Sequence, residues 1–147
     1  MKKLFRLFPL LFVAVLALGA TSCSDDKDEP VSSAELPAKA QEFVSTYFPT
    51  ATITLTTKDK DEYEVFLSEG TRIDFNKAGE WQDVDAAPGK VVPSGFYPAA
   101  IDENVAEVAA DAGINEISKE SYGYEVELLS GLEMKFDQNG AFISFDK

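Results

Sequence analysis

Apolar and polar positions follow two different spacings along residues 36–86. Apolar residues first recur every three or four positions after Pro37, which predicts a helix that ends before Pro49. Alternating apolar residues and β-branched residues then predict four strands separated by short turns: 52–57, 63–67, 72–75 and 81–85. The connections are of hairpin length, so we expect neighbouring strands to run antiparallel.

The same pattern returns over residues 97–147. The two segments align without a gap at a constant offset of 61, and 14 of the 51 aligned pairs are identical, most densely where YEVFLSEGTRIDF meets YEVELLSGLEMKF. Internal similarity of this kind is typical of a duplicated unit. The second segment is predicted to begin with a helix at Pro98 and to continue with four strands: 114–119, 124–129, 132–136 and 141–145.

Each segment of 51 residues is too small to bury a sufficient core alone, and a chain with one cysteine has no internal disulfide to staple it. We therefore expect an α+β fold, a tandem repeat of one helix plus a four-stranded antiparallel meander (36–86 and 97–147). Both helices would cover one face of a shared antiparallel sheet. The other face would then be open, which antiparallel sheets permit.

The N-terminus has the pattern of an export signal. Three basic residues precede an apolar run at 7–20 that is too short to cross a bilayer comfortably. The letters ATSC that follow resemble a bacterial lipobox, in which the chain is cut before the cysteine and the cysteine is lipidated. We predict a signal peptide at 1–22, lipidation of Cys23, and an acidic tether at 23–35.

The run SDDKDEP after the cysteine resembles the export signal of surface-exposed lipoproteins in Bacteroidota-type bacteria. We expect an outer-membrane lipoprotein, with surface display and an inward-facing orientation both left open. Removing residues 1–22 changes the net charge from −13 to −16, because three basic residues are lost. An acidic surface repels nucleic acid and anionic lipid, so we expect no nucleic-acid partner and membrane contact through the anchor alone.

Several positions recur in both segments with a family-like pattern. A proline precedes each helix, Tyr-Glu-Val-x-Leu forms a strand, a glycine turn follows, and Gly-x-Trp or Gly-x-Phe comes after the next strand. This pattern resembles the PepSY-like, β-lactamase-inhibitor-protein-like domain family over residues 36–147. The resemblance implies a domain whose open sheet face binds another protein. Its motifs are hydrophobic and turn positions, so no inhibitory residue is carried over.

The amino-acid composition excludes most of the residue sets that common catalytic sites need. The chain has no histidine, and its single cysteine is assigned to lipid, which excludes Ser-His and Cys-His pairs and the commonest zinc ligand. The acidic runs at 59–62 and 137–140 lack the spacing of a calcium loop, and Asn139-Gly140 is typical of a hairpin turn. We expect no enzyme activity, no cofactor and no dedicated metal site. The 26 carboxylates keep open a glycan hydrolase and weak divalent-cation binding.

Strand alternation predicts which side chains face away from the helices. If Tyr63, Val65, Leu67, Ile73 and Phe75 point to the core, their neighbours should lie on the open face. The residues expected there are Glu64, Phe66, Arg72 and Asp74 in the first segment and Glu125, Glu127, Leu129, Glu133 and Lys135 in the second. Trp81 and Phe142 are out of phase with the apolar residues that follow them, so they lie either on that face or at the core edge. The candidate partner-binding residues are Phe66, Arg72, Trp81, Leu129, Lys135 and Phe142.

These observations predict a non-enzymatic envelope lipoprotein that presents an open sheet face to a protein partner. A structural or accessory envelope lipoprotein without a dedicated ligand is the alternative.

Overall fold

The computed structural model describes residues 29–110 and 112–146. The predicted signal peptide, Cys23 and the tether before residue 29 lie outside the described residues. The described chain forms one nine-stranded antiparallel sheet, and the strands are ordered as they occur in the sequence. They are β1 (Glu29–Pro30), β2 (Ile53–Lys58), β3 (Glu62–Leu67), β4 (Arg72–Asn76), β5 (Trp81–Asp85), β6 (Ile114–Glu120), β7 (Gly123–Leu128), β8 (Glu133–Asp137) and β9 (Phe142–Phe145).

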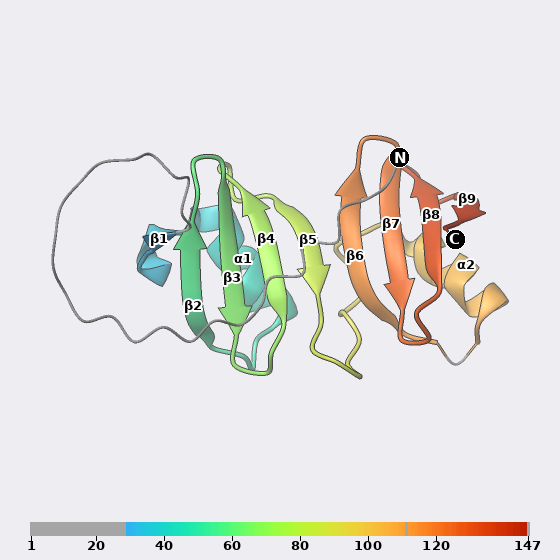
Figure 1. Ribbon diagram of the computed structural model, residues 1–147, viewed down its shortest axis with the longest axis horizontal. Helices are drawn as coiled ribbons and strands as arrows, with labels where there is room; N and C mark the ends of the chain where they lie inside the picture. The colour runs from blue at the N-terminus through green and yellow to red at the C-terminus, as the bar shows by residue number, and fades with distance from the viewer. Residues whose placement is uncertain (1–28, 111, 147) are drawn as a thin grey trace, which may run out of the picture.

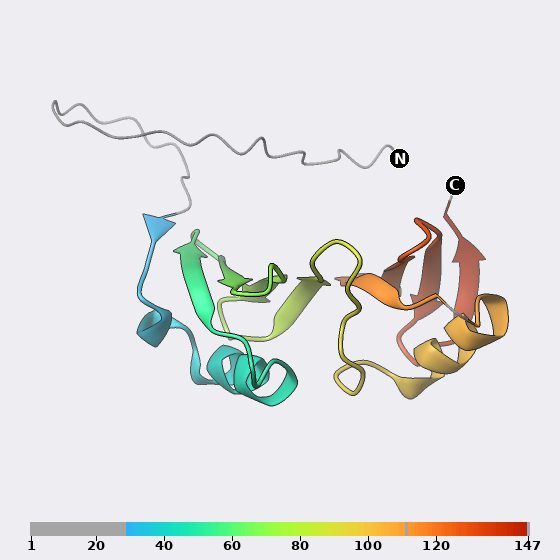
Figure 2. The ribbon, with the colours of Figure 1, turned by 90° about the horizontal axis from the view of Figure 1, so that it is seen from below.

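Two α-helices, α1 (Ala38–Tyr47) and α2 (Ala99–Val108), lie on one face of this sheet (Figures 1 and 2). A short 3-10 helix, η1 (Ser33–Glu35), precedes α1. None of the helices in the described part of the chain has the length and hydrophobicity needed to cross a membrane.

This architecture corrects the predicted fold class. A tandem repeat of one helix plus a four-stranded meander was wrong, because the chain is a single nine-stranded antiparallel sheet, mostly strand, with only two α-helices in its described part. The physical reason is that an unpaired strand edge exposes backbone N–H and C=O groups, which pairing between β5 and β6 satisfies. Three residue pairs make this junction: Asp83 with Ser118, Val84 with Ile117, and Asp85 with Glu116.

The N-terminal edge of the sheet is built from residues 29–35, which belong to the predicted tether. β1 pairs with the end of β2, and η1 follows it. The Ser32 hydroxyl caps η1, and the Glu35 carboxylate accepts a hydrogen bond from the Ser32 N–H in return. The polar composition of this segment did not indicate that it packs at the sheet edge.

The hydrophobic core lies between the sheet and the two helices. α1 buries Ala40 and Val44, and α2 buries Ile101 and Val105. The turn between β4 and β5 packs against the start of α1, where a Cβ at Gly79 would lie 2.7 Å from the Pro37 Cβ. The strands contribute alternate side chains that are fully buried: Val65, Ile73, Phe75, Val84, Ile117, Val126, Leu128, Met134 and Phe136.

A β-bulge turns Trp81 toward the helices. The pairing register of β4 and β5 shifts between Asp74 and Phe75, so Trp81 pairs with Phe75 while Val84 pairs with Ile73. The extra residue of a bulge changes the alternation of side chains, and both apolar residues of β5 therefore face the core.

The Trp81 ring belongs to an aromatic cluster between the sheet and the helices. Only 7% of this residue is exposed. Its ring lies 5.0 Å from the Phe96 ring and 6.1 Å from the Tyr124 ring, and the Lys119 Nζ lies 4.3 Å from its centroid. A cation over the face of an indole adds electrostatic attraction to this packing.

Candidate functional site: an acidic sheet face

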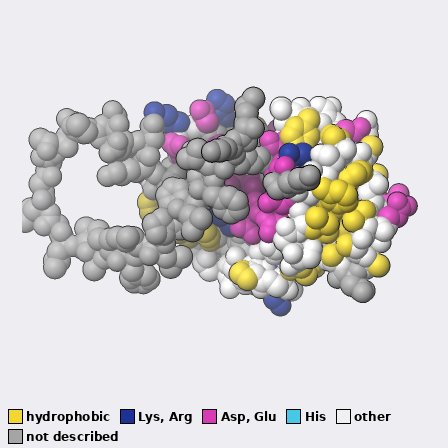
Figure 3. Space-filling view, turned by 45° about the vertical axis from the view of Figure 1, so that its right-hand side comes forward, with side chains coloured by type: hydrophobic (Ala, Val, Ile, Leu, Met, Phe, Trp, Pro, Cys, Tyr) yellow, Lys and Arg dark blue, Asp and Glu magenta, His cyan; other side chains and the backbone are white. Residues whose placement is uncertain are grey.

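The face of the sheet opposite the helices carries mainly acidic side chains. Cross-strand pairing places them in two rows. The first row joins Glu64, Asp74 and Asp83 across β3, β4 and β5. The second row begins at Arg72 and crosses β5 to β8 through Asp85, Glu116, Glu127 and Glu133. We call these seven carboxylates the acidic face. Figure 3 shows Asp and Glu side chains gathered near the middle of the molecule.

Arg72 is the cation at the centre of this face. Its Nη1 lies 3.7 Å from Glu64 Oε1, and its Nη2 lies 3.6 Å from Asp83 Oδ1 and 4.0 Å from Asp85 Oδ2. Burial alone would lower the pKa of Arg72, but the surrounding carboxylates, led by Asp74, raise it above its ordinary value. One guanidinium therefore faces several carboxylates, and the centre of the face keeps a negative excess.

Two carboxylates of the first row are largely removed from water. The Oδ1 atoms of Asp74 and Asp83 are buried and accept no hydrogen bond from the residues that the structure describes. Burial raises the pKa of Asp74 to about 6, against the opposing effect of Arg72. Burial, with repulsion from Glu116 and Asp74, raises the pKa of Asp83 to about 8.

The second row shows the same effect across the junction of β5 and β6. Burial raises the pKa of Asp85, and Arg72 opposes this shift. Burial and repulsion from Asp85 and Glu127 raise the pKa of Glu116, and burial and repulsion from Glu133 raise the pKa of Glu127. The ionised face is therefore unfavourable in isolation, and any positive charge placed against it relieves that cost.

Stability should fall as the pH rises through this range. A carboxylate whose pKa is raised on folding stabilises the native state below its unfolded value, near 4, and this contribution is lost as pH passes its folded value. For Asp74 and Asp83 the loss should extend from about pH 4 to about pH 8. Urea unfolding of Asp83→Asn should match the native protein near pH 4.5 and exceed it by about 1–3 kcal/mol near pH 8.5.

The matched control for this prediction is Asp61→Asn. The Asp61 side chain is 74% exposed and pairs with Lys77 on the surface. Its substitution should change the free energy of unfolding little at either pH. Equal behaviour of Asp83→Asn and Asp61→Asn across the pH range would contradict the assigned burial of the acidic face.

A second group of carboxylates lies toward the C-terminal end of the same face. Carboxylate oxygens of Glu125, Glu133 and Asp146 all lie within 4.8 Å of one another, which is close enough to hold a cation. Lys135 Nζ lies 2.9 Å from Asp146 Oδ2, and the Tyr122 hydroxyl donates to Glu125 Oε2 at 2.7 Å. An added metal ion would therefore compete with the Lys135 ammonium group for the Asp146 carboxylate. We call these three carboxylates the C-terminal triad.

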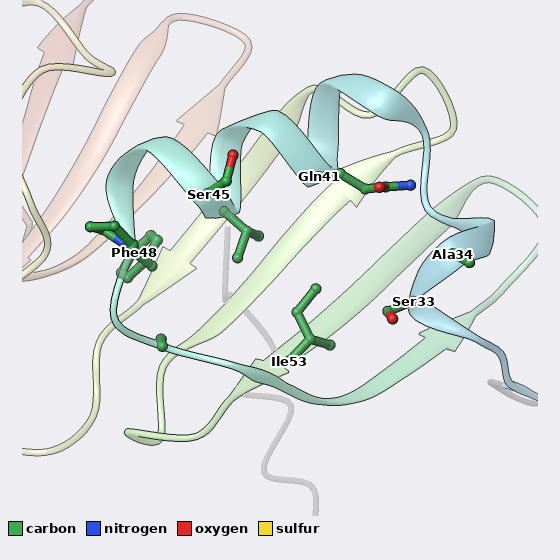
Figure 4. Close-up of a pocket in the computed structure, with 9 residues that line it drawn as sticks. Ser33, Ala34, Gln41, Ser45, Phe48 and Ile53 are labelled. Atoms are coloured by element: carbon green, nitrogen blue, oxygen red, sulfur yellow. The ribbon is translucent and has the colours of Figure 1, made fainter.

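The groove lined by α1, η1 and the start of β2 is a different kind of feature (Figure 4). Its volume is about 480 Å³, and Val44, Phe48 and Ile53 supply much of its apolar wall. Ser33, Gln41 and Ser45 add polar groups, and no carboxylate lines it. The groove lies on the helix side of the sheet and is separate from the acidic face.

Comparison with protein families decides the affiliation of the chain. A family model described as "putative beta-lactamase-inhibitor-like, PepSY-like" matches residues 22–70 and 61–144. The chain belongs to the PepSY-like family. This confirms the resemblance that was read from the recurring proline, tyrosine and glycine positions. A search of curated proteins found no match.

Several solved structures that are similar to this chain come from Bacteroides species. A "putative calcium-regulated periplasmic protein" from Bacteroides thetaiotaomicron is 31% identical, with a TM-score of 0.76, and the match covers 82% of this chain and 97% of that one. A "putative periplasmic protein" from Bacteroides vulgatus is 32% identical, with a TM-score of 0.76 and coverages of 84% and 100%. Another from B. vulgatus, "of unknown function", is 31% identical, with a TM-score of 0.77 and coverages of 82% and 100%.

Three predicted site residues of this PepSY-like protein lie on the open face: Phe66, Arg72 and Lys135. Phe66 pairs with Arg72 across β3 and β4, and it is half-buried at the border of the acidic face. Lys135 lies beside the C-terminal triad and forms an ion pair with Asp146. Leu129 is 44% exposed, but it follows β7 in the turn to β8, at the end of the sheet. The structure brings Phe66 and Arg72 together, whereas Lys135 and Leu129 lie apart from them.

The sequence left Trp81 and Phe142 open between the open face and the core edge, and both lie on the helix side of the sheet. Trp81 is buried in the aromatic cluster, so its ring is not available on the open face. Phe142 pairs with Phe136 and packs against its ring on the helix side, at the edge of the sheet. A register shift between Lys135 and Phe136 brings Phe142 and Phe145 to the same side, as the other bulge does for Trp81.

Sequence reasoning missed the acidic residues on both sides of the junction between β5 and β6. Asp83, Asp85 and Glu116 become neighbours only because these two strands pair. Alternation around Val84 could have placed the two aspartates on the open face, but nothing in the sequence indicated which strand would lie beside them.

Proposed function

We propose that this protein is a non-enzymatic binding module of the cell envelope that captures a protein partner on its acidic face, and that the partner contributes Lys or Arg side chains. The observation that carries the proposal is the cluster of Glu64, Asp74, Asp83, Asp85 and Glu116 around Arg72. A face that is costly when ionised and unaccompanied gains most from a cationic partner.

The contacts that such a partner would make follow from the geometry. The buried Oδ1 atoms of Asp74 and Asp83 accept no hydrogen bond from the described residues, and Arg72 Nη2 lies 3.6 Å from the second of them. A cationic partner on the face would offset part of the cost of ionising these two carboxyl groups. Phe66 adds an aromatic surface at the border of the same patch. Aromatic anchors surrounded by polar groups are typical of binding sites.

The proposed location combines two observations. The N-terminal sequence has an export signal and a lipobox-like cysteine at position 23. The similar solved structures carry descriptions as periplasmic proteins. We place the protein in the envelope as an outer-membrane lipoprotein anchored through Cys23. Protease treatment of intact cells distinguishes surface display, in which the domain is degraded, from an inward-facing orientation, in which it is protected.

Chemical cross-linking on intact cells, followed by mass spectrometry, tests the binding role. A variant that combines Asp83→Asn, Asp85→Asn and Glu116→Gln keeps the shape of the face and replaces three carboxyl groups with neutral amides. It should lose at least about tenfold of the cross-linked partner, because the cationic contacts lose their counter-charges. The control combines Glu42→Gln, Glu103→Gln and Glu107→Gln on exposed helix positions and should retain it. Equal recovery would contradict the proposal, and no enriched species at all would favour an accessory role.

A calcium response is the second candidate function. The C-terminal triad offers three carboxylates within reach of one ion, and one of the similar structures is described as calcium-regulated. If calcium binds there, millimolar CaCl₂ should raise the melting temperature of the native protein, and Glu133→Gln with Asp146→Asn should abolish that rise. An equal rise in the variant would place any calcium effect elsewhere.

A further inference from the structure

β9 is the C-terminal edge strand and combines an open side with exposed apolar side chains. It pairs with β8, and no strand of the described chain lies on its other side. Phe142 is 39% exposed, Ile143 51% and Phe145 46%. An edge strand offers backbone N–H and C=O groups on its outer side, so another extended segment can pair with it.

The helix-side layer of the core ends abruptly at this edge. Phe142 pairs with Phe136, and Phe145 pairs with Met134, and both partners are fully buried. Phe142 and Phe145 also contact each other, with ring centroids 4.9 Å apart. The buried layer therefore extends onto β9 but is left uncovered there. Apolar side chains on an added strand would cover it.

The opposite edge of the sheet lacks these properties. β1 has only two residues, Glu29 and Pro30. A charged residue and a proline without an N–H are devices that block pairing at sheet edges. Strand addition is thus favoured at one end of the sheet only.

Charge indicates what kind of segment fits at β9. On the open side of the sheet, Ser144 pairs with Lys135, next to Glu133 and Asp146 of the C-terminal triad. Alternate side chains of an added strand would point to this side and meet the triad. Two copies of this chain would bring two acidic triads to one seam, which like-charge repulsion opposes, whereas Lys or Arg would complement them.

We propose that β9 accepts an extended segment of the partner as a tenth strand, with apolar side chains toward Phe142 and Phe145 and Lys or Arg side chains toward Glu133 and Asp146. This inference rests on the proposed function, since it names the binding mode and the chemistry of the partner segment.

The probe is a labelled peptide of about ten residues with alternating Val and Lys, and its control has the same residues in two blocks. Only the alternating peptide can present one apolar and one cationic side as a strand. Fluorescence anisotropy should show that the alternating peptide binds the native protein at least about tenfold more tightly. Equal binding of both peptides would show non-specific charge attraction and overturn the proposal.

Two variants separate backbone pairing from charge. Ile143→Pro keeps the net charge, removes one backbone N–H from β9 and fixes the backbone of this edge strand, and it should weaken binding of the alternating peptide at least about tenfold. Glu133→Gln with Asp146→Asn keeps the backbone of β9 intact and should also weaken it several-fold, with a smaller dependence on salt. Undiminished binding by the folded charge variant would overturn the proposal even if Ile143→Pro fails to fold. A dimer by sedimentation velocity that Ile143→Pro abolishes would identify a second copy as the occupant and also overturn it.

The cellular experiment distinguishes this inference from the proposed function. One outcome is that the acidic-face variant with three neutral residues loses the cross-linked partner while Ile143→Pro retains it. In that case strand addition at β9 is wrong, and the binding role of the acidic face stands. If both variants retain the partner, the binding role of the acidic face fails as well.

Discussion

Trp81→Ala is expected to lower the free energy of unfolding by about 3–5 kcal/mol. The indole ring is buried between the sheet and the helices, and its removal leaves a cavity lined by Phe43, Phe96 and Tyr124. Lys119 would also lose the ring that its ammonium group contacts. Urea unfolding, followed by circular dichroism, measures this loss.

The comparison with Phe66→Ala makes this result informative. Phe66 is half-buried on the open face, so its truncation should cost about 1 kcal/mol or less in stability. Its effect should appear in partner capture instead. The contrary result would be a small stability loss for Trp81→Ala together with lost partner capture by the folded variant. It would show that the Trp81 ring lies on the binding surface and not in the core.

Arg72→Met is expected to destabilise the protein by about 2 kcal/mol near pH 8. Methionine keeps an apolar stem, but Glu64, Asp83 and Asp85 lose the cation that lies 3.6–4.0 Å from them. Near pH 5 the loss should be clearly smaller, because carboxylates with raised pKa values take up protons and no longer need a counter-charge. Unfolding curves at the two pH values give the difference.

Lys77→Met is the matched control for Arg72→Met. Lys77 forms a 3.2 Å ion pair with Asp61, and the two side chains are 76% and 74% exposed. Exposed pairs contribute little, so this change should cost less than about 0.5 kcal/mol at both pH values. If Arg72→Met costs the same at pH 5 and pH 8, the role of Arg72 is packing rather than charge compensation.

The positions of most helices and strands could be predicted from local periodicity. The apolar stripe after Pro37 and the alternation around Val65 depend on contacts that every residue of a helix or strand makes with its own core face. Alternation also placed Phe66 and Arg72 on the open face. These inferences succeeded because the side-chain period along an uninterrupted strand is fixed.

The rest depended on contacts between distant segments and on local irregularities. Pairing between β5 and β6 joins Asp85 to Glu116 across a long connection, and no local pattern encodes that partnership. The bulges in β5 and β9 shift the alternation by one residue, so alternation alone left Trp81 and Phe142 open between the open face and the core edge. Alternation placed Glu64, Asp74, Glu127 and Glu133 on the open face, whereas Asp83, Asp85 and Glu116 were missed for the first reason. The two aromatic positions stayed ambiguous for the second.

The most direct test of the account places a photo-cross-linking amino acid at Phe66, on the border of the acidic face, and separately at Glu103, on an exposed position of α2. Irradiation of intact cells that carry the full lipoprotein is predicted to trap a protein partner with basic segments from position 66 and to trap little from position 103. The same partner trapped equally from both positions, or from position 103 alone, would contradict binding at the open acidic face.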